Sequence, residues 1–327
     1  MMMKRISSLD GVRGLAILAV FFHHSLHLKL MWMGVDLFFV LSGFLITGVL
    51  LAMKERSLQD YFSVFYERRA RRILFPYLLF LLIATLFLGF GWARYWYFYI
   101  LLTNFLLPFH IPHPQAFDPL WSLAVEEQFY VLWPFAVYFL NRKHLKWLCV
   151  FLILLAPTLR ALLHFQQHWP IYALTPFRMD LLAVGGLMQI VRQESSSAFQ
   201  QKAGKLAMWI SLSGAVLILA LSKFGYTTYG NSRTGNVLIY EASLLICSGC
   251  MLFALFSPKA RILTFAPLRY LGKISYTFYL VHLGAIEIAF HWLHGLGAVF
   301  VAGCLAVGYA ALSWHFLESK LLTSKPR

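Results

Sequence analysis

The sequence predicts an all-α membrane protein, a bundle of about ten helices that cross a lipid bilayer. Of its 327 residues, 60% are hydrophobic and only 13% are charged, whereas a soluble globular chain has roughly 25% charged residues. Ten apolar segments have the length of about 17 to 25 residues that a membrane-crossing helix requires. No long polar stretch separates them, so we expect one domain that comprises residues 1–327.

The ten expected helices follow one another through short connections. Their ranges are 9–29, 33–53, 72–91, 119–140, 145–163, 171–191, 206–222, 236–256, 274–293 and 296–316. The segment 95–107 is also apolar, but it is short and aromatic, so we expect it to be interfacial or re-entrant rather than an eleventh crossing.

Basic residues fix the expected orientation. If the N-terminus is cytoplasmic and there are ten crossings, most of the 28 Lys and Arg residues fall on the cytoplasmic side, as the positive-inside rule requires. Both termini are then cytoplasmic, in a membrane of the bacterial plasma-membrane type. The net charge of +15 therefore reflects membrane topology, and no nucleic-acid partner is expected.

The cysteines do not predict a metal site. Cys247 and Cys250 are spaced C-x-x-C, but they lie inside an expected membrane helix and no second pair of ligands accompanies them. We interpret them as buried and inert, and expect no bound metal.

The first expected helix carries ionisable residues in an apolar stretch. Arg13 and His24 are eleven residues apart, so at about 100° per residue they share one face and lie roughly 16 Å apart along it. Asp10 lies on the same side. Ionisable groups inside a bilayer are costly and normally face a cavity or a partner, which makes this face a candidate functional site.

A dense arginine cluster follows the second expected helix, in the segment FYERRARRILFPY. It comprises Arg68, Arg69, Arg71 and Arg72. Guanidinium groups bind phosphates in bidentate fashion and keep their charge at any physiological pH. Two readings remain open: an anchor for anionic lipids or a site for a phosphorylated ligand.

Further carboxylates and a second histidine lie within apolar segments. Asp36 is near the outer end of its segment, toward which His24 also points, and a carboxylate there can orient an imidazole. Of the adjacent Glu126 and Glu127, at least one should face the protein interior. His282 is either a packed core histidine or a functional residue.

Arg178 and Asp180 form another charged pair in an apolar segment. Mutual compensation of intramembrane charges explains them without a functional role, and a place in a substrate pathway is the alternative.

Six motifs occur in the order of a known family. They are Arg13 followed after ten intervening residues by His24, GVDLFFVLSGFLIT, FYERRARRILFPY, DPLWSLAVEEQFYVLWP, FRMDLLAVGG and LGKISYTFYLVHL. Together the motifs resemble the acyltransferase 3 family of integral membrane O-acyltransferases over about residues 7–318. The family's motif positions fall on Arg13, His24, Arg69, Arg72, Trp121, Ser122 and Glu126. Because the chain stops soon after the last helix, it resembles the members without a C-terminal hydrolase-like domain.

The resemblance implies transfer of an acyl group, often acetyl, from cytoplasmic acyl-CoA to a hydroxyl of a glycan or another exported acceptor. On this basis we expect a donor site at Arg13, Arg68, Arg69, Arg71 and Arg72. We expect catalysis by His24 with Asp36 or Glu126, and acceptor contacts from Trp121, Ser122, Glu127, Arg178, Asp180 and His282. A neutral imidazole, with an unperturbed pKa of about 6.5, can deprotonate a hydroxyl near pH 7, although His24 acting as an acyl carrier remains open.

The alternative function is a transporter or flippase of a lipid-linked or anionic solute. Intramembrane Arg, Asp, Glu and His residues also suit a solute pathway. Transporters are often built from paired repeats with broken helices, and the sequence has no clear internal repeat. The asymmetry between a basic end and a His, Asp and Glu end favours group transfer.

Overall fold

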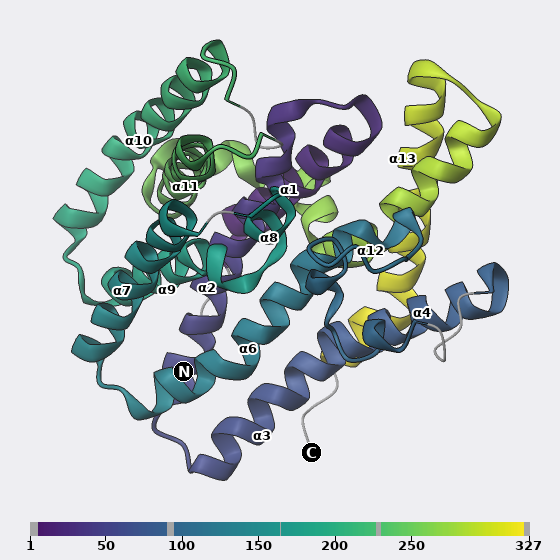
Figure 1. Ribbon diagram of the computed structural model, residues 1–327. Helices are drawn as coiled ribbons and strands as arrows, with labels where there is room; N and C mark the ends of the chain where they lie inside the picture. The colour runs from purple at the N-terminus through teal and green to yellow at the C-terminus, as the bar shows by residue number, and fades with distance from the viewer. Residues whose placement is uncertain (1–5, 90–94, 164, 227–229, 324–327) are drawn as a thin grey trace.

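The structure, a computed structural model, describes residues 6–89, 95–163, 165–226 and 230–323. In these ranges all regular secondary structure is helical (Figure 1), which confirms the all-α prediction. The long helices are α1 (Ser7–Leu26), α2 (Met33–Met53), α3 (Leu58–Arg69), α4 (Phe75–Leu88), α6 (Trp121–Phe139), α7 (Arg142–Leu162), α9 (Met179–Glu194), α10 (Ser197–Lys223), α11 (Arg233–Phe256), α12 (Ala266–Trp292) and α13 (Gly295–Ser313).

Each of the ten expected segments corresponds to one of these helices, with α3 as an additional helix between the second and third. Within the described ranges, five helical stretches are long and apolar enough to cross a membrane. They are Lys29–Met53, Arg142–Leu162, Ser197–Lys223, Arg233–Phe256 and Gly295–Leu321. The chain is thus an integral membrane protein, while ten crossings and the orientation of the termini stay predictions.

The sixth expected segment, 171–191, is broken rather than continuous. It contains the short α8 (Trp169–Ala173), the 3₁₀ turn η6 (Thr175–Phe177) and then α9. Leu174 is extended at the break, and Pro176 contributes to it because it has no N–H group to bond the carbonyl four residues earlier. The break places Arg178 at the start of α9.

The segment 95–107 forms no long helix. It folds into the 3₁₀ turns η3 (Trp96–Phe98) and η4 (Thr103–Phe105), and the Thr103 hydroxyl donates a hydrogen bond of 2.7 Å to the carbonyl of Leu120. The segment is therefore tied to the start of α6, in agreement with the expectation that it does not cross.

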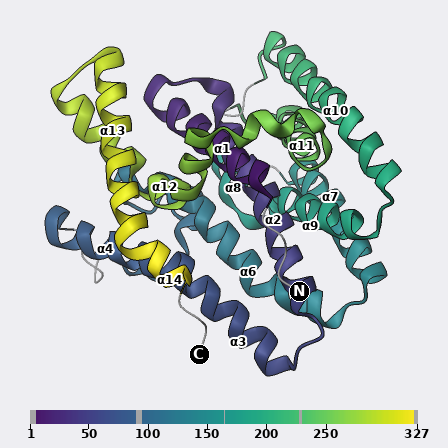
Figure 2. The ribbon, with the colours of Figure 1, turned by 180° about the vertical axis from the view of Figure 1, so that it is seen from behind.

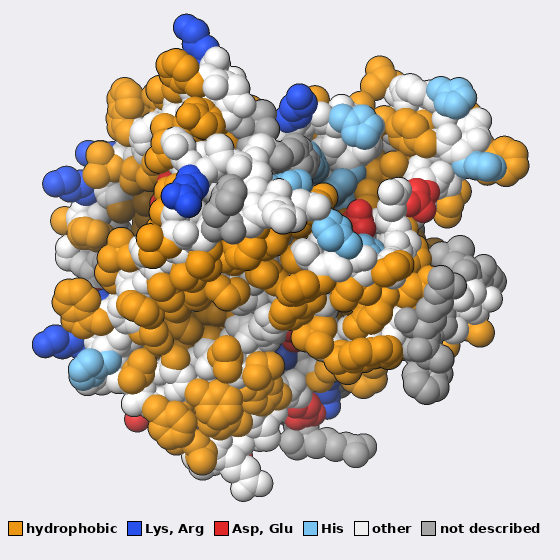
Figure 3. Space-filling model, viewed as in Figure 1, with side chains coloured by type: hydrophobic (Ala, Val, Ile, Leu, Met, Phe, Trp, Pro, Cys, Tyr) orange, Lys and Arg blue, Asp and Glu red, His pale blue; other side chains and the backbone are white. Residues whose placement is uncertain are grey.

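Helices α1 and α2 lie in the middle of the bundle (Figures 1 and 2). Helix α1 packs on α12 and α2, α2 packs on α9, and α9 packs on α7. Helix α10 lies at the periphery in both views and packs chiefly on α11. Orange hydrophobic side chains cover much of the face seen in Figure 3, as expected of a surface in contact with lipid.

Glycines permit the closest helix contacts. A Cβ atom added to Gly272 of α12 would lie 1.8 Å from the carbonyl oxygen of Asp10 in α1, and one added to Gly43 of α2 would lie 1.9 Å from that of Leu182 in α9. Small residues at helix contacts are typical of membrane bundles. The contact at Gly272 sets how near α1 lies to α12, and both helices contribute to the site described next.

Gly272→Ala is expected to destabilise the fold by about 1–3 kcal/mol, because the added methyl group forces two backbones apart. Thermal unfolding in detergent provides the measurement. Gly284→Ala on the same helix is the matched control, since its added Cβ would meet no atom within 4 Å and alanine favours helix. Equal unfolding temperatures for the two variants would contradict the close approach of α1 and α12.

Candidate active site

Three cavities lie in series through the bundle. The basic cavity, about 410 Å³, is lined by Asp10, Arg13, Arg69, Arg72, Lys273, Trp314 and Glu318, among others. The waist, about 90 Å³, is lined by Ser42, Ser122, Glu126, Tyr130, Tyr276 and Tyr279, with further residues. The histidine cavity, about 360 Å³, has walls that include His23, His24, His27, Lys29, Asp118, Trp121, Trp169 and Tyr172.

Adjacent cavities share lining side chains, so they lie next to one another, and we call the row of three the passage. Arg13, Arg69 and Arg72 line both the basic cavity and the waist. Val35 and Tyr279 line both the waist and the histidine cavity. Helix α1 runs beside the passage, with Arg13 at the basic end and His24 at the other, as their shared helical face predicts.

The basic cavity gathers cations from four elements. Arg13 comes from α1, Arg69 from α3, Arg72 from the π-helical turn η2 (Ala70–Leu74) and Lys273 from α12. The Arg69 guanidinium lies over the Tyr130 ring, 4.6 Å from its centroid, a favourable cation–π contact. Such a cavity suits a ligand with several phosphate charges.

The structure divides the predicted arginine cluster. Arg69 and Arg72 face the basic cavity, whereas Arg68 and Arg71 line none of the three cavities. Arg71 instead forms an ion pair of 2.5 Å with Glu67, one helical turn before it. The positions of Arg68 and Arg71 therefore do not support the expectation that they belong to the donor site.

Pro76 accounts for the π-helical turn that carries Arg72. A proline has no N–H group to give to the carbonyl four residues earlier, and here the N–H of Phe75 bonds the carbonyl of Ala70, five residues back. The wider turn is typical of functional sites in helices.

Glu126 and Glu127 face different surroundings, as the cost of burying adjacent carboxylates predicts. Glu126 lies in the waist and accepts a hydrogen bond of 2.6 Å from the Ser42 hydroxyl. Glu127 lines none of the three cavities, so its predicted contact with substrate is not supported by its position.

Hydroxyl groups mark the junction between the waist and the histidine cavity. The Ser122 and Tyr279 oxygens are 2.7 Å apart, and the Tyr279 hydroxyl donates to the carbonyl of Pro119 at 2.7 Å. Tyr279 lines both cavities. These contacts join the start of α6 to the middle of α12 at the point where the passage changes width.

The histidine cavity combines aromatic walls with a carboxylate. Trp121 and Tyr172 contact each other, with ring centroids 4.7 Å apart. The Asp118 side chain, 39% exposed, accepts a hydrogen bond of 2.7 Å from His113. Burial lowers the pKa of His113, but the hydrogen bonds to Asp118 and to the Ile111 carbonyl outweigh it, so that its pKa is raised above the ordinary value. Their pairing holds Asp118 at the cavity wall.

His24 contacts a second histidine rather than a carboxylate. Its Nδ1 atom lies 3.2 Å from Nε2 of His282 and 3.0 Å from the carbonyl oxygen of Val20. Nδ1 of His282 lies 2.7 Å from the carbonyl oxygen of Tyr279. His282 is only 1% exposed and lines none of the cavities, so its predicted contact with the acceptor is not supported. Among the described residues, no group of three or more His, Cys, Asp or Glu side chains is arranged to hold a metal ion.

Asp36 does not lie against His24, contrary to the expectation that it orients the imidazole. It forms a fully buried ion pair with Arg178 and accepts a hydrogen bond of 2.7 Å from Ser243. A buried guanidinium requires a counter-charge, and Asp36 satisfies that need. Glu126 likewise bonds Ser42 rather than His24.

Arg178 and Asp180 line none of the three cavities and pair with other partners instead of each other. Asp180 bonds Arg160 of α7 at 2.7 Å, and Arg160 also bonds Glu241 of α11 at 2.7 Å. The result agrees with charge compensation within the bundle and does not support substrate contact.

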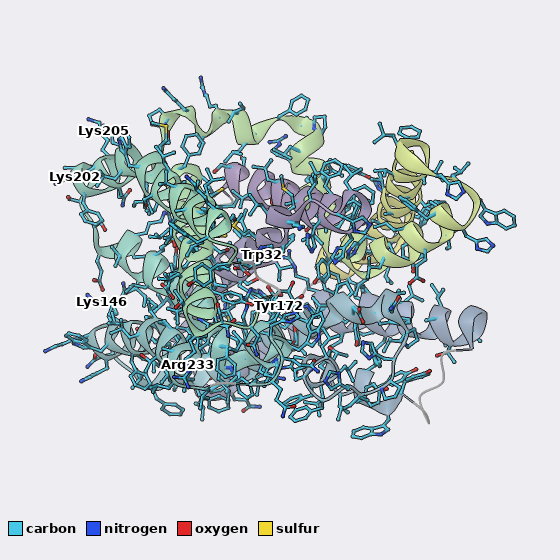
Figure 4. The ribbon with its side chains drawn as sticks, turned by 45° about the horizontal axis from the view of Figure 1, so that its top comes forward. Trp32, Lys146, Tyr172, Lys202, Lys205 and Arg233 are labelled. Carbon is cyan, nitrogen blue, oxygen red and sulfur yellow. The ribbon has the colours of Figure 1, made fainter. Side chains whose placement is uncertain are left out.

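Arg178 also lies against one wall of the histidine cavity. Its guanidinium lies 5.7–6.0 Å from the ring centroids of Trp32, Trp121 and Tyr172, all of which line that cavity. Figure 4 shows Trp32 and Tyr172 near the middle of the molecule, whereas Lys146, Lys202 and Lys205 lie at its edge.

Sequence reasoning missed several residues of the passage. They are Asp118, Tyr130, Trp169, Tyr172, Lys273, Tyr276, Tyr279 and Trp314. Tyr276 and Tyr279 precede His282 at helical spacing, so the periodicity of α12 carried a signal for them. The others come from elements whose spatial neighbours a single sequence does not reveal.

The fold and the passage define a helical membrane protein with a basic site at one end of an internal passage and an imidazole at the other. Residues 6–316 match the family model described as "Acyltransferase domain". The chain belongs to this acyltransferase family.

Curated relatives extend the comparison. The peptidoglycan O-acetyltransferase OatA of Listeria monocytogenes is 29% identical in an alignment of 321 positions that covers 87% of this chain and 50% of the relative. The O-acetyltransferase OatA of Staphylococcus aureus is 25% identical in an alignment of 359 positions that covers 97% of this chain and 57% of the relative. The chain thus spans about half the length of these relatives. No solved structure matches it.

Asp36→Asn is expected to lower the free energy of unfolding by about 3–5 kcal/mol, because it leaves the buried Arg178 charge without a counter-ion. Unfolding in detergent, followed by loss of the monodisperse peak on gel filtration, measures the effect. The control is Glu194→Gln, which removes the exposed partner of Lys146 and should change stability by no more than about 1 kcal/mol. Similar losses in both variants would refute the structural role of the buried pair.

Proposed function

We propose that this chain is a membrane O-acyltransferase that moves an acetyl group from acetyl-CoA to a hydroxyl of a glycan of the cell envelope. The passage is the observation that carries the proposal. It joins a cavity suited to phosphates with a cavity that contains an imidazole and aromatic walls. Membership of the acyltransferase family supports the reaction type.

The donor would bind with its phosphates in the basic cavity. Arg69, Arg72 and Arg13 would contact them, aided by Lys273. The pantetheine arm would extend through the waist toward His24, along the rise of about 16 Å that separates Arg13 from His24 on α1. The waist, about 90 Å³, suits an unbranched chain that carries a small acyl group.

His24 would act as a general base at the far end. Its Nε2 atom would take the proton of the acceptor hydroxyl while the hydroxyl oxygen attacks the thioester carbonyl carbon. Collapse of the tetrahedral intermediate breaks the C–S bond, and the CoA thiolate takes the proton back from Nε2. An O-acetyl ester and CoA leave, and His24 returns to its neutral form.

A saccharide suits the histidine cavity. Trp121, Trp169 and Tyr172 offer apolar ring faces, and Asp118 offers a carboxylate for hydroxyl groups. The two relatives described above are an O-acetyltransferase and a peptidoglycan O-acetyltransferase by name, which supports a cell-envelope glycan as the acceptor. Asp118, rather than Asp36, is the carboxylate at this site.

In the proposed orientation the basic cavity lies on the cytoplasmic side of a bacterial plasma membrane, where acetyl-CoA is made. Both termini lie on the same side. The positive-inside pattern of the sequence supports it. The waist is much smaller than the cavities on either side, which favours entry of an unbranched acyl-bearing chain over transport of a whole saccharide.

His24→Ala should reduce acetyl transfer at least a hundredfold, because a general base contributes about 10² to 10⁴ in rate. Proteoliposomes supplied with radiolabelled acetyl-CoA and solubilised peptidoglycan fragments provide the assay, with base-labile label on the fragments as the product. His291→Ala is the control, since His291 is exposed and on α12. A fully active His24→Ala protein would contradict the proposed mechanism.

Replacing both Arg69 and Arg72 with alanine should raise the KM for acetyl-CoA more than tenfold, since each hydrogen bond to a charged group contributes about 1.5–3 kcal/mol. The same assay, run over a range of acetyl-CoA concentrations, measures it. Arg68→Ala is the matched control, because Arg68 lies on the same helix and faces none of the cavities. An unchanged KM in the double variant would mean that acetyl-CoA does not bind in the basic cavity.

A further inference from the structure

His282 sits behind His24 as seen from the histidine cavity. His24 lines the cavity and is half-buried, whereas His282 is 1% exposed and lines no cavity. The two rings are 5.0 Å apart between centroids. His282 is therefore close enough to act on His24 and too deeply placed to meet an acceptor in that cavity.

The contacts of His282 determine which of its nitrogens carries a proton. Nδ1 lies 2.7 Å from the Tyr279 carbonyl oxygen, and a carbonyl can only accept, so Nδ1 must be the donor. In a neutral imidazole the other nitrogen is then an acceptor. A neutral ring suits this buried position, because an unpaired charge there would be costly. Nε2 of His282 therefore presents a lone pair to His24.

The same reasoning assigns His24. Its Nδ1 atom faces two acceptors, Nε2 of His282 at 3.2 Å and the Val20 carbonyl oxygen at 3.0 Å. Nδ1 must carry the proton, which leaves Nε2 as the basic atom. Among the described residues no protein group hydrogen-bonds that Nε2 atom, and His24 lines the histidine cavity. The basic nitrogen is thus free to meet a hydroxyl there.

We infer that His282 is a positioning residue that fixes the ring orientation of His24 and stabilises its imidazolium form through the Nδ1–H to Nε2 hydrogen bond. The inference rests on the proposed function, in which His24 is the base. His282 stands where a catalytic triad has its aspartate, because its Nε2 atom accepts from Nδ1–H of the base, but unlike that aspartate it is neutral. Nothing ionised needs to be buried behind His24 in the resting state, which suits a site inside a membrane bundle.

The kinetic test separates positioning from acceptor binding. His282→Ala should lower kcat for acetyl transfer by about 10- to 100-fold, the usual effect of removing an orienting partner of a histidine, with the KM values for acetyl-CoA and for peptidoglycan fragments within about twofold of wild type. His282→Gln should recover part of kcat, because its amide oxygen can accept from Nδ1 of His24. His291→Ala, on the same helix and exposed, should match wild type. A raised KM for the fragments with unchanged kcat would overturn the inference.

A second measurement does not depend on transfer. Solid-state NMR of the ¹⁵N-histidine-labelled protein in lipid bilayers reports which nitrogen of each ring is protonated, and His24→Gln and His282→Gln variants identify the two signals. Protonated Nδ1 on both rings supports the inference. Protonated Nε2 on His24 overturns it whatever the activity. If the protonation pattern is as inferred but wild-type protein transfers no acetyl group, the arrangement stands and the proposed function fails.

Discussion

The buried ion network between α2, α7, α9 and α11 is the constraint on which the rest of this bundle depends. Arg178 pairs with Asp36, and Arg160 pairs with Asp180 and Glu241. Two guanidinium groups without exposure to solvent cannot remain ionised alone in a medium of low dielectric constant. Their carboxylate partners come from three different helices, so pairing fixes how those helices meet.

The network also supports the site without touching it. Arg178 lies beneath the aromatic rings of Trp32, Trp121 and Tyr172, which form a wall of the histidine cavity. At the other end of α1, near the basic cavity, the contact at Gly272 holds α1 against α12, and the same pair of helices brings His24 to His282. Charge pairing thus supports the aromatic wall, and close backbone contact fixes how α1 and α12 meet.

Much of the fold and part of the site could be predicted from the sequence, because both depend on features local to one helix. Apolar length identified ten segments that all became helices. The shared face of Arg13 and His24 identified side chains that line the passage, and the family's motif positions added Arg69 and Arg72. The break before α9 also has a local cause, Pro176. We nevertheless expected the sixth segment to form one continuous helix.

Partners across helices could not be predicted in this way. Helical periodicity tells which residues share a face and does not tell which helix opposes that face. Asp36 was therefore expected beside His24, although it pairs with Arg178. The contact between His24 and His282 was missed, because 258 positions separate the two residues in the chain. The division between Arg69 and Arg71 depends on a π-helical turn, which changes the angle between successive side chains.

A route for a ligand through a membrane protein can also let ions leak across the membrane. A passage open at both ends would let protons and cations leak down the membrane potential, which is worth about 2.3 kcal/mol per charge for each 100 mV. Arg13, Arg69 and Arg72 all line the waist, the smallest of the three cavities, and fixed positive charge in a pore repels cations and protons. In the proposed orientation, the residues that would attract an anionic donor would therefore also oppose the leak that its route would otherwise create.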